Sequence, residues 1–453
     1  MAGYSYNMVP RSVPKVETRF RRIVTRIPVP ESIPILETLR RYEPVAMTGQ
    51  PPVVWDRAEG FQVYDRWGNM WLDWSSGVVV ANCGHGREEM RRAIIKQVEH
   101  GLLHNYCFPS EIRSKLVEKL VQLAPKGLDK VFLLTTGAET IENAIKLTRT
   151  YGRKINKRKI GIVTFTNAFH GRTLGAQMAG GISSLKEWIG EYPPGFYQVP
   201  FPDGFRCEDT SFELFLRTLK DQGIDGSSIC GVIMETYIGG GASFAPKRYV
   251  QQLSEWCKEN DVALVFDEVQ AGFGRTGKFF GFEHYGVTPD IICCGKGITS
   301  SLPLSAVIGR QEFLDQYGPG EMTSTHTGNP VCVAASLASI DIIEREGLVE
   351  NAKRVGERLH EELLRIKQRH AIVGAIHGMG LVAGLHIVKE GSKEPDKERA
   401  FGIVERSMEK GLLFFSPVGF GGGTIKICPP LNITEEAIMD GIKAMEEAMG
   451  EST

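Results

Sequence analysis

The sequence of 453 residues lacks several features that mark particular classes of protein. Its net charge is only -1, which argues against binding nucleic acid or an anionic membrane through bulk charge. No apolar run approaches the length of a membrane span, and residues 1–30 lack the apolar core of a secretory signal. The nine cysteines include no C-x-x-C pair, a pattern typical of reduced thiols in a cytosolic protein. We therefore expect a cytoplasmic protein without nucleic-acid or membrane partners, and we assign no metal site.

The overall composition is ordinary for a soluble globular protein, with 42% hydrophobic and 24% charged residues. The length allows about two or three domains with a large core. Residues 1–44 are rich in arginine and proline, which predicts an extended arm rather than a folded unit. A solvated arm, or one that embraces another subunit, is favoured over a targeting or RNA-binding arm.

Short strand-like segments occupy residues 53–75, where the turn at Arg66–Asn69 predicts a hairpin between Phe61–Tyr64 and Met70–Trp74. Val53–Trp55 is a further candidate strand. From about residue 86, continuous apolar strands alternate with amphipathic helices, which predicts a mostly parallel sheet covered on both faces. The strands expected there are Lys130–Thr135, Ile160–Thr166, Ile229–Glu235, Val262–Asp267 and Ile291–Gly295, and the helices include Glu139–Arg153, Ser211–Gln222 and Pro246–Asn260.

After about residue 335 the pattern indicates a smaller α+β domain, with helices at Ser336–Glu346 and Leu348–Arg369 and a final helix from Thr434. Strands are expected at Leu381–Ile387 and Thr424–Cys428. We therefore predict an α/β protein in three parts. These are an arm at 1–44, a small α+β domain built from 45–85 and 335–453, and a large α/β domain at 86–334.

Lys296 stands at the end of the apolar run Ile291–Cys294, between Gly295 and Gly297. A buried ammonium is costly, so a lysine in this position tends to lose its charge or to become bonded. An uncharged amine can form a Schiff base with a carbonyl, which is how a lysine holds an aldehyde cofactor. The alternative is a lysine at a strand end that reaches solvent, which this segment alone favours.

Two further motifs occupy the carboxyl ends of strands, where ligands of open α/β sheets bind. Gly137 precedes a helix and could open backbone N–H groups to an anion such as phosphate, or could simply form the turn. Asp267 ends an apolar strand, so its poorly solvated carboxylate needs a cationic or N–H partner, such as a protonated ring nitrogen. Downstream, Gly272, Gly274 and Gly277 match a dinucleotide-binding pattern, which we reject because no helix is predicted to begin there.

Two weaker candidates follow other strands. Phe169 could stack on a flat ring and Arg172 could hold a carboxylate, although a core aromatic beside a surface arginine is the alternative. The segment Ser324–Pro330 is a polar loop whose hydroxyl groups suit a phosphate, or it is only a loop.

Taken together, these segments resemble the class III aminotransferases, which are pyridoxal phosphate enzymes of fold type I. The resemblance runs from about residue 45 to 440 and includes Gly77–His85 and Pro429–Thr434. Its most specific part is Asp-Glu-Val-Gln-x-Gly-x-Gly-Arg-Thr-Gly from Asp267, followed by Gly-Lys-Gly at Lys296. The fold implied has a large domain with a mostly parallel sheet flanked by helices, and a smaller α+β domain.

The resemblance implies a role for each matched residue. Lys296 carries the cofactor as a Schiff base and then moves the proton between the substrate α-carbon and the cofactor, while Asp267 pairs with the pyridinium nitrogen. Gln270 binds the phenolic oxygen and Phe169 stacks on the ring. The backbone N–H groups of Gly137 and Ala138 hold the phosphate, with Thr325 reaching in from a second subunit. That role implies a homodimer, or a higher oligomer, with shared active sites.

Two departures from the family concern the substrate. Lys426 stands where the family typically has an arginine that clamps the substrate α-carboxylate, and a lysine offers no two-pronged fork. Gly240 replaces an acid that masks this arginine in many relatives. Val78, Glu235, Arg172 and Lys426 are the candidate substrate-binding residues, with Arg172 a candidate for a distal carboxylate.

We therefore predict an aminotransferase that moves an amino group from an amine or an ω-amino acid to a keto acid. A racemase or epimerase of the same family is the main alternative, because its chemistry begins with the same loss of a proton from the α-carbon. Decarboxylases and lyases of the family follow. A cofactor-binding regulator without catalysis is disfavoured, because Lys296, Asp267 and Gln270 are all present.

Overall fold

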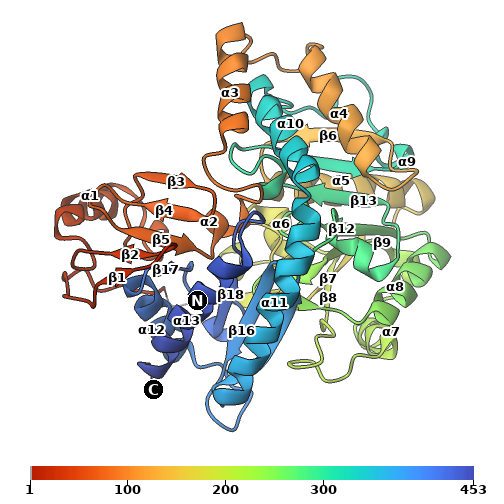
Figure 1. Cartoon of the computed structure of the whole chain (residues 1–453). Helices are drawn as coiled ribbons and strands as arrows, with labels where there is room; N and C mark the ends of the chain where they lie inside the picture. The colour runs from red at the N-terminus through yellow and green to blue at the C-terminus, as the bar shows by residue number, and fades with distance from the viewer. Residues whose placement is uncertain (1–2, 453) are drawn as a thin grey trace. The chain divides into compact units, whose positions relative to one another are not determined.

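A computed structural model describes residues 3–452, which divide into two compact units (Figure 1). Of these residues, the first unit comprises 3–87, 240–242 and 348–452, and the second comprises 88–239 and 243–347. No helix in the part of the chain that the structure describes has both the length and the apolar character needed to cross a bilayer.

The second unit is built on one large sheet, with strand order β6-β14-β13-β12-β9-β7-β8 within residues 3–452. Neighbours from β13 to β8 run parallel, whereas β14 is antiparallel to both β13 and β6. The predicted mostly parallel sheet is therefore confirmed. The strands are β6 (Lys130–Leu134), β7 (Gly161–Phe165), β8 (Phe196–Val199), β9 (Ile229–Glu235), β12 (Ala263–Asp267), β13 (Ile291–Cys294) and β14 (Ser305–Gly309), with a separate hairpin of β10 (Tyr237–Ile238) and β11 (Ser243–Phe244).

Alternate side chains of β12 face different layers of this unit, as the period of two requires. Val265 packs in one core cluster with Ile141 of α5, whereas the ring of Phe266 contacts that of Tyr285. Asp267 lies two residues after Val265 and so belongs to the face that α5 covers. The helices are α3 (Glu88–His100), α4 (Glu111–Leu123), α5 (Gly137–Ile155), α6 (Leu174–Ala179), α7 (Phe212–Asp221), α8 (Lys247–Glu259), α9 (Gln311–Leu314) and α10 (Pro330–Arg345).

The first unit contains, among its described residues, the sheet β1-β2-β5-β4-β3, with β17 beside β5, and the antiparallel sheet β15-β16-β18. The hairpin predicted across Arg66–Asn69 is confirmed by the antiparallel pair β4 and β5. Strand bounds are β1 (Val16–Glu17), β2 (Arg22–Ile23), β3 (Arg57–Glu59), β4 (Gln62–Tyr64), β5 (Met70–Asp73), β15 (Val373–Met379), β16 (Val382–Ile387), β17 (Leu412–Leu413) and β18 (Thr424–Ile427). Helix bounds are α1 (Ile33–Tyr42), α2 (Ser76–Val79), α11 (Leu348–Arg369), α12 (Lys397–Glu409) and α13 (Glu435–Gly450).

The N-terminal segment differs from the extended arm that its composition suggested. It forms β1, β2 and α1, and Ile23, Ile27 and Val29 are buried in a core cluster with Trp71. These apolar side chains are spaced among arginines and prolines, so average composition concealed them. Val53–Trp55 also differs, because it forms no strand. The N–H of Val53 donates to the carbonyl of Pro51, a tight turn that diverts the backbone.

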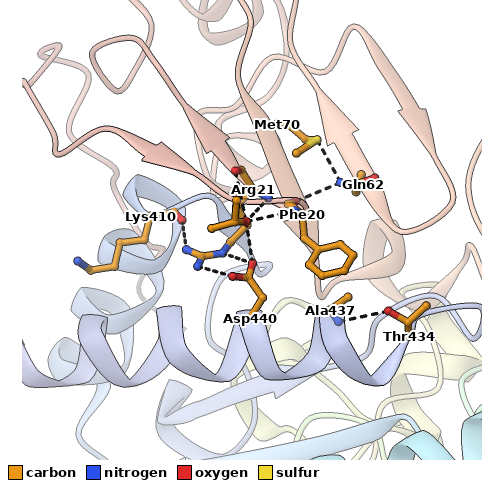
Figure 2. A network of polar contacts seen from close by, with 9 residues as sticks. Phe20, Arg21, Gln62, Met70, Lys410, Thr434, Ala437 and Asp440 are labelled. Atoms are coloured by element: carbon orange, nitrogen blue, oxygen red, sulfur yellow. Dashed lines mark hydrogen bonds and ion pairs between the residues drawn. The ribbon is translucent and has the colours of Figure 1, made fainter.

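A buried ion pair fastens the N-terminal segment to α13 (Figure 2). The side chain of Arg21 is 4% exposed and donates from Nε and Nη2 to the two carboxylate oxygens of Asp440, at 2.6 and 2.9 Å. Its Nη1 donates to the carbonyl of Lys410 at 2.7 Å. Thr18 adds a hydroxyl donor to the same carboxylate at 3.1 Å. The guanidinium therefore donates to Asp440 and to the backbone of Lys410, both far from Arg21 in sequence.

We predict that Arg21→Ala lowers the free energy of unfolding by about 3–5 kcal/mol, because it leaves the partly buried Asp440 carboxylate without its cation. Urea unfolding followed by circular dichroism measures this loss. Arg19→Ala is the matched control, since Arg19 and its partner Glu436 are 78% and 71% exposed and such pairs contribute at most about 1 kcal/mol. Equal losses in the two variants would contradict the prediction.

Candidate active site

Asp267 ends β12 and is 5% exposed. Its Oδ2 lies 2.8 Å from Nδ1 of His170, and its Oδ1 accepts a hydrogen bond of 3.0 Å from the N–H of Val269. The carboxylate thus has the cationic and N–H partners that its burial requires.

His170 was not selected from the sequence, although it follows Phe169 directly. Burial lowers the pKa of this imidazole, but the hydrogen bond and the charge of Asp267 outweigh burial, so the pKa is raised above its usual value. The contact with Asp267 therefore favours the protonated form of His170. The contact forms only in the folded sheet, where the segment after β7 lies close to the end of β12.

Glu235 extends the same buried cluster from the neighbouring strand. β9 pairs with β12 in parallel, and the register sets Glu235 opposite Asp267. The carboxylate of Glu235 accepts the N–H of Phe169 at 2.9 Å and that of Gly239 at 3.1 Å. Burial, reinforced by the charge of Asp267 and opposed by that of His170, raises the pKa of Glu235 to about 7. The acid is therefore poised to change its charge near neutral pH.

Lys296 lies at the same edge of the sheet, because β13 pairs with β12 in parallel with Asp267 opposite Cys293. The residue is half-buried and has a φ of +45°, in the left-handed region that disfavours residues with a Cβ. Such a conformation costs about 1 kcal/mol or more and persists where the surroundings impose it, often at functional sites. The surroundings thus hold Lys296 in a strained backbone conformation, at the residue predicted to bear the cofactor.

The start of α5 lies at this edge as well. Thr136 is the N-cap, and Glu139 closes a capping box with it, which satisfies the N–H of Thr136 at 2.7 Å. The next N–H groups, of Gly137 and Ala138, belong to the first helical turn and have no acceptor within the helix.

Close packing explains the glycines around this helix start. A Cβ atom built on Gly137 would lie 2.8 Å from Cγ1 of Val269, and one on Gly171 would lie 2.7 Å from Cβ of Ala138. Small residues therefore bring the helix start, the segment after β12 and the segment after Phe169 into one cradle.

Phe169, Arg172 and Gln270 border the cluster. Phe169 is half-buried, and the guanidinium carbon of the exposed Arg172 lies 5.6 Å from the centre of its ring. A Cβ atom built on Gly239 would collide with Nε2 of Gln270 and lie 2.6 Å from Oε1 of Glu235. The Gln270 amide therefore lies beside the Glu235 carboxylate. The second unit thus brings these three residues to the edge that carries Asp267 and Lys296.

The remaining predicted residues belong to a loop of the second unit or to the first unit. Thr325 is exposed in a loop of the second unit. Val78 and Lys426 belong to the first unit, where Val78 has a φ of +67° and is 46% exposed, and Lys426 is 2% exposed in β18. The left-handed φ at Val78 is unusual for a β-branched residue, and three neighbouring residues share it: Ser76, Gly77 and Val79.

The rejected dinucleotide-binding pattern takes no helical form. Gly272, Gly274 and Gly277 lie in successive turns between β12 and the 3₁₀ helix Gly281–Tyr285, and within the described residues no helix starts among them. The rejection is therefore confirmed.

Pyridoxal phosphate fits the residues at this edge of the sheet. A buried carboxylate at Asp267 suits a protonated ring nitrogen, and the aromatic ring of Phe169 suits a flat heterocycle. The cradle at Gly137 and Ala138 offers N–H groups and a helix N-terminus to a phosphate. Lys296 supplies the amine that an aldehyde requires.

The chain is similar to known aminotransferases over most of its length. The sequence profile of the family aminotransferase class-III matches residues 45–449. A probable 4-aminobutyrate aminotransferase of Bacillus subtilis is 35% identical over 87% of this chain and 92% of its own. An alanine/serine racemase of Pyrococcus horikoshii is 32% identical over 98% and 96% of the two chains. The crystal structure of an (S)-enantioselective omega-transaminase from Thermomicrobium roseum superposes with a TM-score of 0.85, at 28% identity over 92% of this chain and 98% of that one.

The family profile spans nearly the whole chain, and the relatives at more than 30% identity are matched almost from end to end. The buried carboxylate, the helix-start cradle and the strained lysine agree with the chemistry of that family. The chain therefore belongs to the class III aminotransferases and is a transaminase that depends on pyridoxal phosphate.

Proposed function

We propose that this transaminase takes an amine or an ω-amino acid as its amino donor and a keto acid as its acceptor. The surroundings of Gly240 carry the proposal. A Cβ atom built on Gly240 would lie 2.9 Å from Cα of Gly419, so this position has no room for the acid that many relatives carry. With Lys426 in place of the usual arginine, both halves of the pair that controls the grip on an α-carboxylate are replaced.

The relatives support the same donor class. The Bacillus subtilis relative is a probable 4-aminobutyrate aminotransferase, and the Thermomicrobium roseum enzyme is an omega-transaminase. Arg172, exposed beside Phe169, is our candidate to bind a distal carboxylate of such a donor. Val78 and Glu235 are proposed as further substrate contacts.

When bound, pyridoxal phosphate supplies an aldehyde that bonds to amines and a ring that withdraws electrons from the substrate α-carbon. Asp267 would keep the proton on the ring nitrogen, and the hydrogen bond from His170 would hold that carboxylate in place. Phe169 would stack on the ring, and Gln270 would donate to the phenolic oxygen. The N–H groups of Gly137 and Ala138 would bind the phosphate.

Lys296 would have two roles. Its Nζ would hold the cofactor covalently in the resting enzyme. Once the donor displaces it, the same amine would take the proton from the substrate α-carbon as general base. It would then deliver that proton to the cofactor as general acid. Return of the proton to the opposite face of the α-carbon would instead give racemisation, and the Pyrococcus horikoshii relative supports that second candidate.

We also propose a homodimer, or a higher oligomer, in which Thr325 completes the phosphate site of the partner. Large exposed apolar side chains gather on α3 and the loop after it, and Phe108 is 74% exposed. The hydroxyl of Tyr106 lies 2.8 Å from that of Thr323, so this apolar loop contacts the loop that carries Thr325. Sedimentation velocity of the purified protein tests the proposal, and a monomer at micromolar concentration would contradict it.

A cytoplasmic location is proposed as well. No disulfide joins any of the nine cysteines, which all lie within residues 3–452, and Cys293 and Cys294 are adjacent in the buried strand β13. Reduced thiols are typical of that compartment. Fractionation of cells that express the full chain tests this location.

A donor panel tests the proposed reaction. Single donors are mixed with the holoenzyme, and the cofactor absorbance is followed with and without pyruvate or 2-oxoglutarate. We expect kcat/KM for ω-amines and ω-amino acids to exceed that for glutamate by about tenfold or more, the effect of losing one charged hydrogen-bonded contact. Much faster reaction with glutamate would overturn the donor class. Inversion of a chiral donor without any keto acid would identify a racemase.

A further inference from the structure

Residues 416–423, Ser-Pro-Val-Gly-Phe-Gly-Gly-Gly, form a loop directly before β18 that we call the glycine loop. Three of its four glycines have positive φ angles of 61° to 75°. Backbone hydrogen bonds of 2.9 Å in both directions between Val418 and Thr424 close its base, and Phe420 near its tip is 49% exposed. Glycine loses more conformational freedom on ordering than any other residue, so this loop needs contacts from outside to keep one conformation.

The glycine loop lies between the two positions at which the chain departs from its family. A Cβ atom built on Gly419 would lie 2.8 Å from the carbonyl oxygen of Gly240 and 2.5 Å from Oγ1 of Thr424. Thr424 begins β18, the strand that carries Lys426. A shift of the loop would therefore be passed to Gly240 and to the start of that strand.

Two N-terminal tyrosines hold the glycine loop at its two ends. The hydroxyl of Tyr4 donates to the carbonyl of Gly422 at 2.7 Å. The hydroxyl of Tyr6, which is 3% exposed, lies 2.9 Å from Oγ of Ser416. Because Ser416 Oγ donates its own proton to the carbonyl of Gly49 at 2.5 Å, Tyr6 is the donor to Ser416.

The tyrosines are themselves anchored on α12. The ring of Tyr4 stacks on Phe401 with centroids 5.0 Å apart and planes 10° apart, and the ring of Tyr6 lies 4.7 Å from the same ring. Burial raises the pKa of both phenols, so their hydroxyl groups stay protonated donors at neutral pH.

We propose that Tyr4 and Tyr6 are positioning residues that fasten the glycine loop and thereby set how tightly the amino donor binds. The inference rests on the proposed function, in which Gly240 and Lys426 decide the choice of donor. Neither hydroxyl is needed for the proton transfers assigned to Lys296. Loss of the hydroxyls therefore raises the KM of the donor and leaves kcat and the cofactor unchanged.

The test compares Tyr4→Phe, Tyr6→Phe and the double variant in the full-length holoenzyme. Phenylalanine keeps the stacking on Phe401 and removes only the hydroxyl. Tyr42→Phe is the matched control, because Tyr42 on α1 is 74% exposed. Hydrogen exchange of residues 416–424 is measured by mass spectrometry, and KM and kcat are measured with the best donor from the panel.

In the double variant we expect exchange of this segment to be at least about tenfold faster, from two hydrogen bonds of about fivefold each. We expect the KM of the donor to rise about three- to tenfold, with kcat and cofactor absorbance within about twofold of the original. Unchanged exchange would overturn the fastening, and faster exchange with an unchanged KM would overturn the role in donor binding. The donor used in this test is the one with the highest measured rate, whatever its class. Hydrogen exchange and KM therefore still test this inference if the proposed donor class proves wrong.

Discussion

Replacing Lys296 with alanine is expected to lower the rate of amino transfer by about 10⁴-fold, the upper end of what one proton-transferring side chain supplies. The variant loses both the amine that would hold the cofactor and the base that would act on the substrate α-carbon. Single-turnover measurements with pyridoxal phosphate and the best donor would quantify the loss. The absorbance of the covalently held cofactor should disappear as well.

Lys278→Ala is the matched control for this result, because Lys278 is an exposed lysine in the same unit, in the segment between β12 and β13. Its rate should stay within about twofold of the original, as for most surface substitutions. An alanine variant at 296 that kept a tenth of the activity would refute the role of that amine.

A glycine at 296 separates catalysis from stability. The φ of +45° disfavours any residue with a Cβ, and glycine adopts it freely. Lys296→Gly should therefore be as inactive as the alanine variant and up to about 1 kcal/mol more stable than it. If lysine were present at this position for packing alone, the glycine variant would be less stable than the original protein. The comparison thus tests whether the strained backbone is maintained for function.

Much of the second unit could be predicted from local pattern. Strands β9, β12 and β13 are runs of buried apolar residues that end in a polar or glycine residue, and each was predicted to within one residue at either end. In the first unit, helix α11 likewise coincides with its prediction at Leu348–Arg369. These elements are long or uniformly apolar, so their type is decided by residues close together in sequence.

The sequence-based predictions fail where contacts between residues far apart in sequence determine burial and pairing. The burial of Arg21 depends on Asp440, which is 419 residues away, and composition alone assigned that segment to an exposed arm. His170 was missed because only the pairing of β7 and β12 with β9 between them brings it to Asp267. A local signal did exist. His170 follows Phe169 directly near a strand end, and the sequence already indicated that the Asp267 carboxylate needs a cationic partner.

Asp267→Asn is expected to lower the rate of amino transfer by about 10²- to 10³-fold, the usual loss when one preorganised charge is removed from an active site. Asparagine has nearly the same shape and can still accept the N–H of Val269 through Oδ1. Its amide group, however, would donate toward Nδ1 of His170, which must then give up its proton there. The pKa of His170 would fall, so the variant loses a positive as well as a negative charge.

Asp290→Asn controls for the loss of a partly buried aspartate. Asp290 has a matching environment, with an N–H donor from Leu264 at 2.8 Å and a cation, Arg310, at 3.0 Å. It lies at the opposite end of β13, immediately before the strand, so its loss should reduce stability without a comparable change in rate. If both asparagine variants lost activity in proportion to stability, the Asp267 effect would be structural. A large loss of rate in Asp267→Asn alone, with pyridoxal phosphate still bound, would show that the charged pair of Asp267 and His170 acts on the reaction and not only on stability.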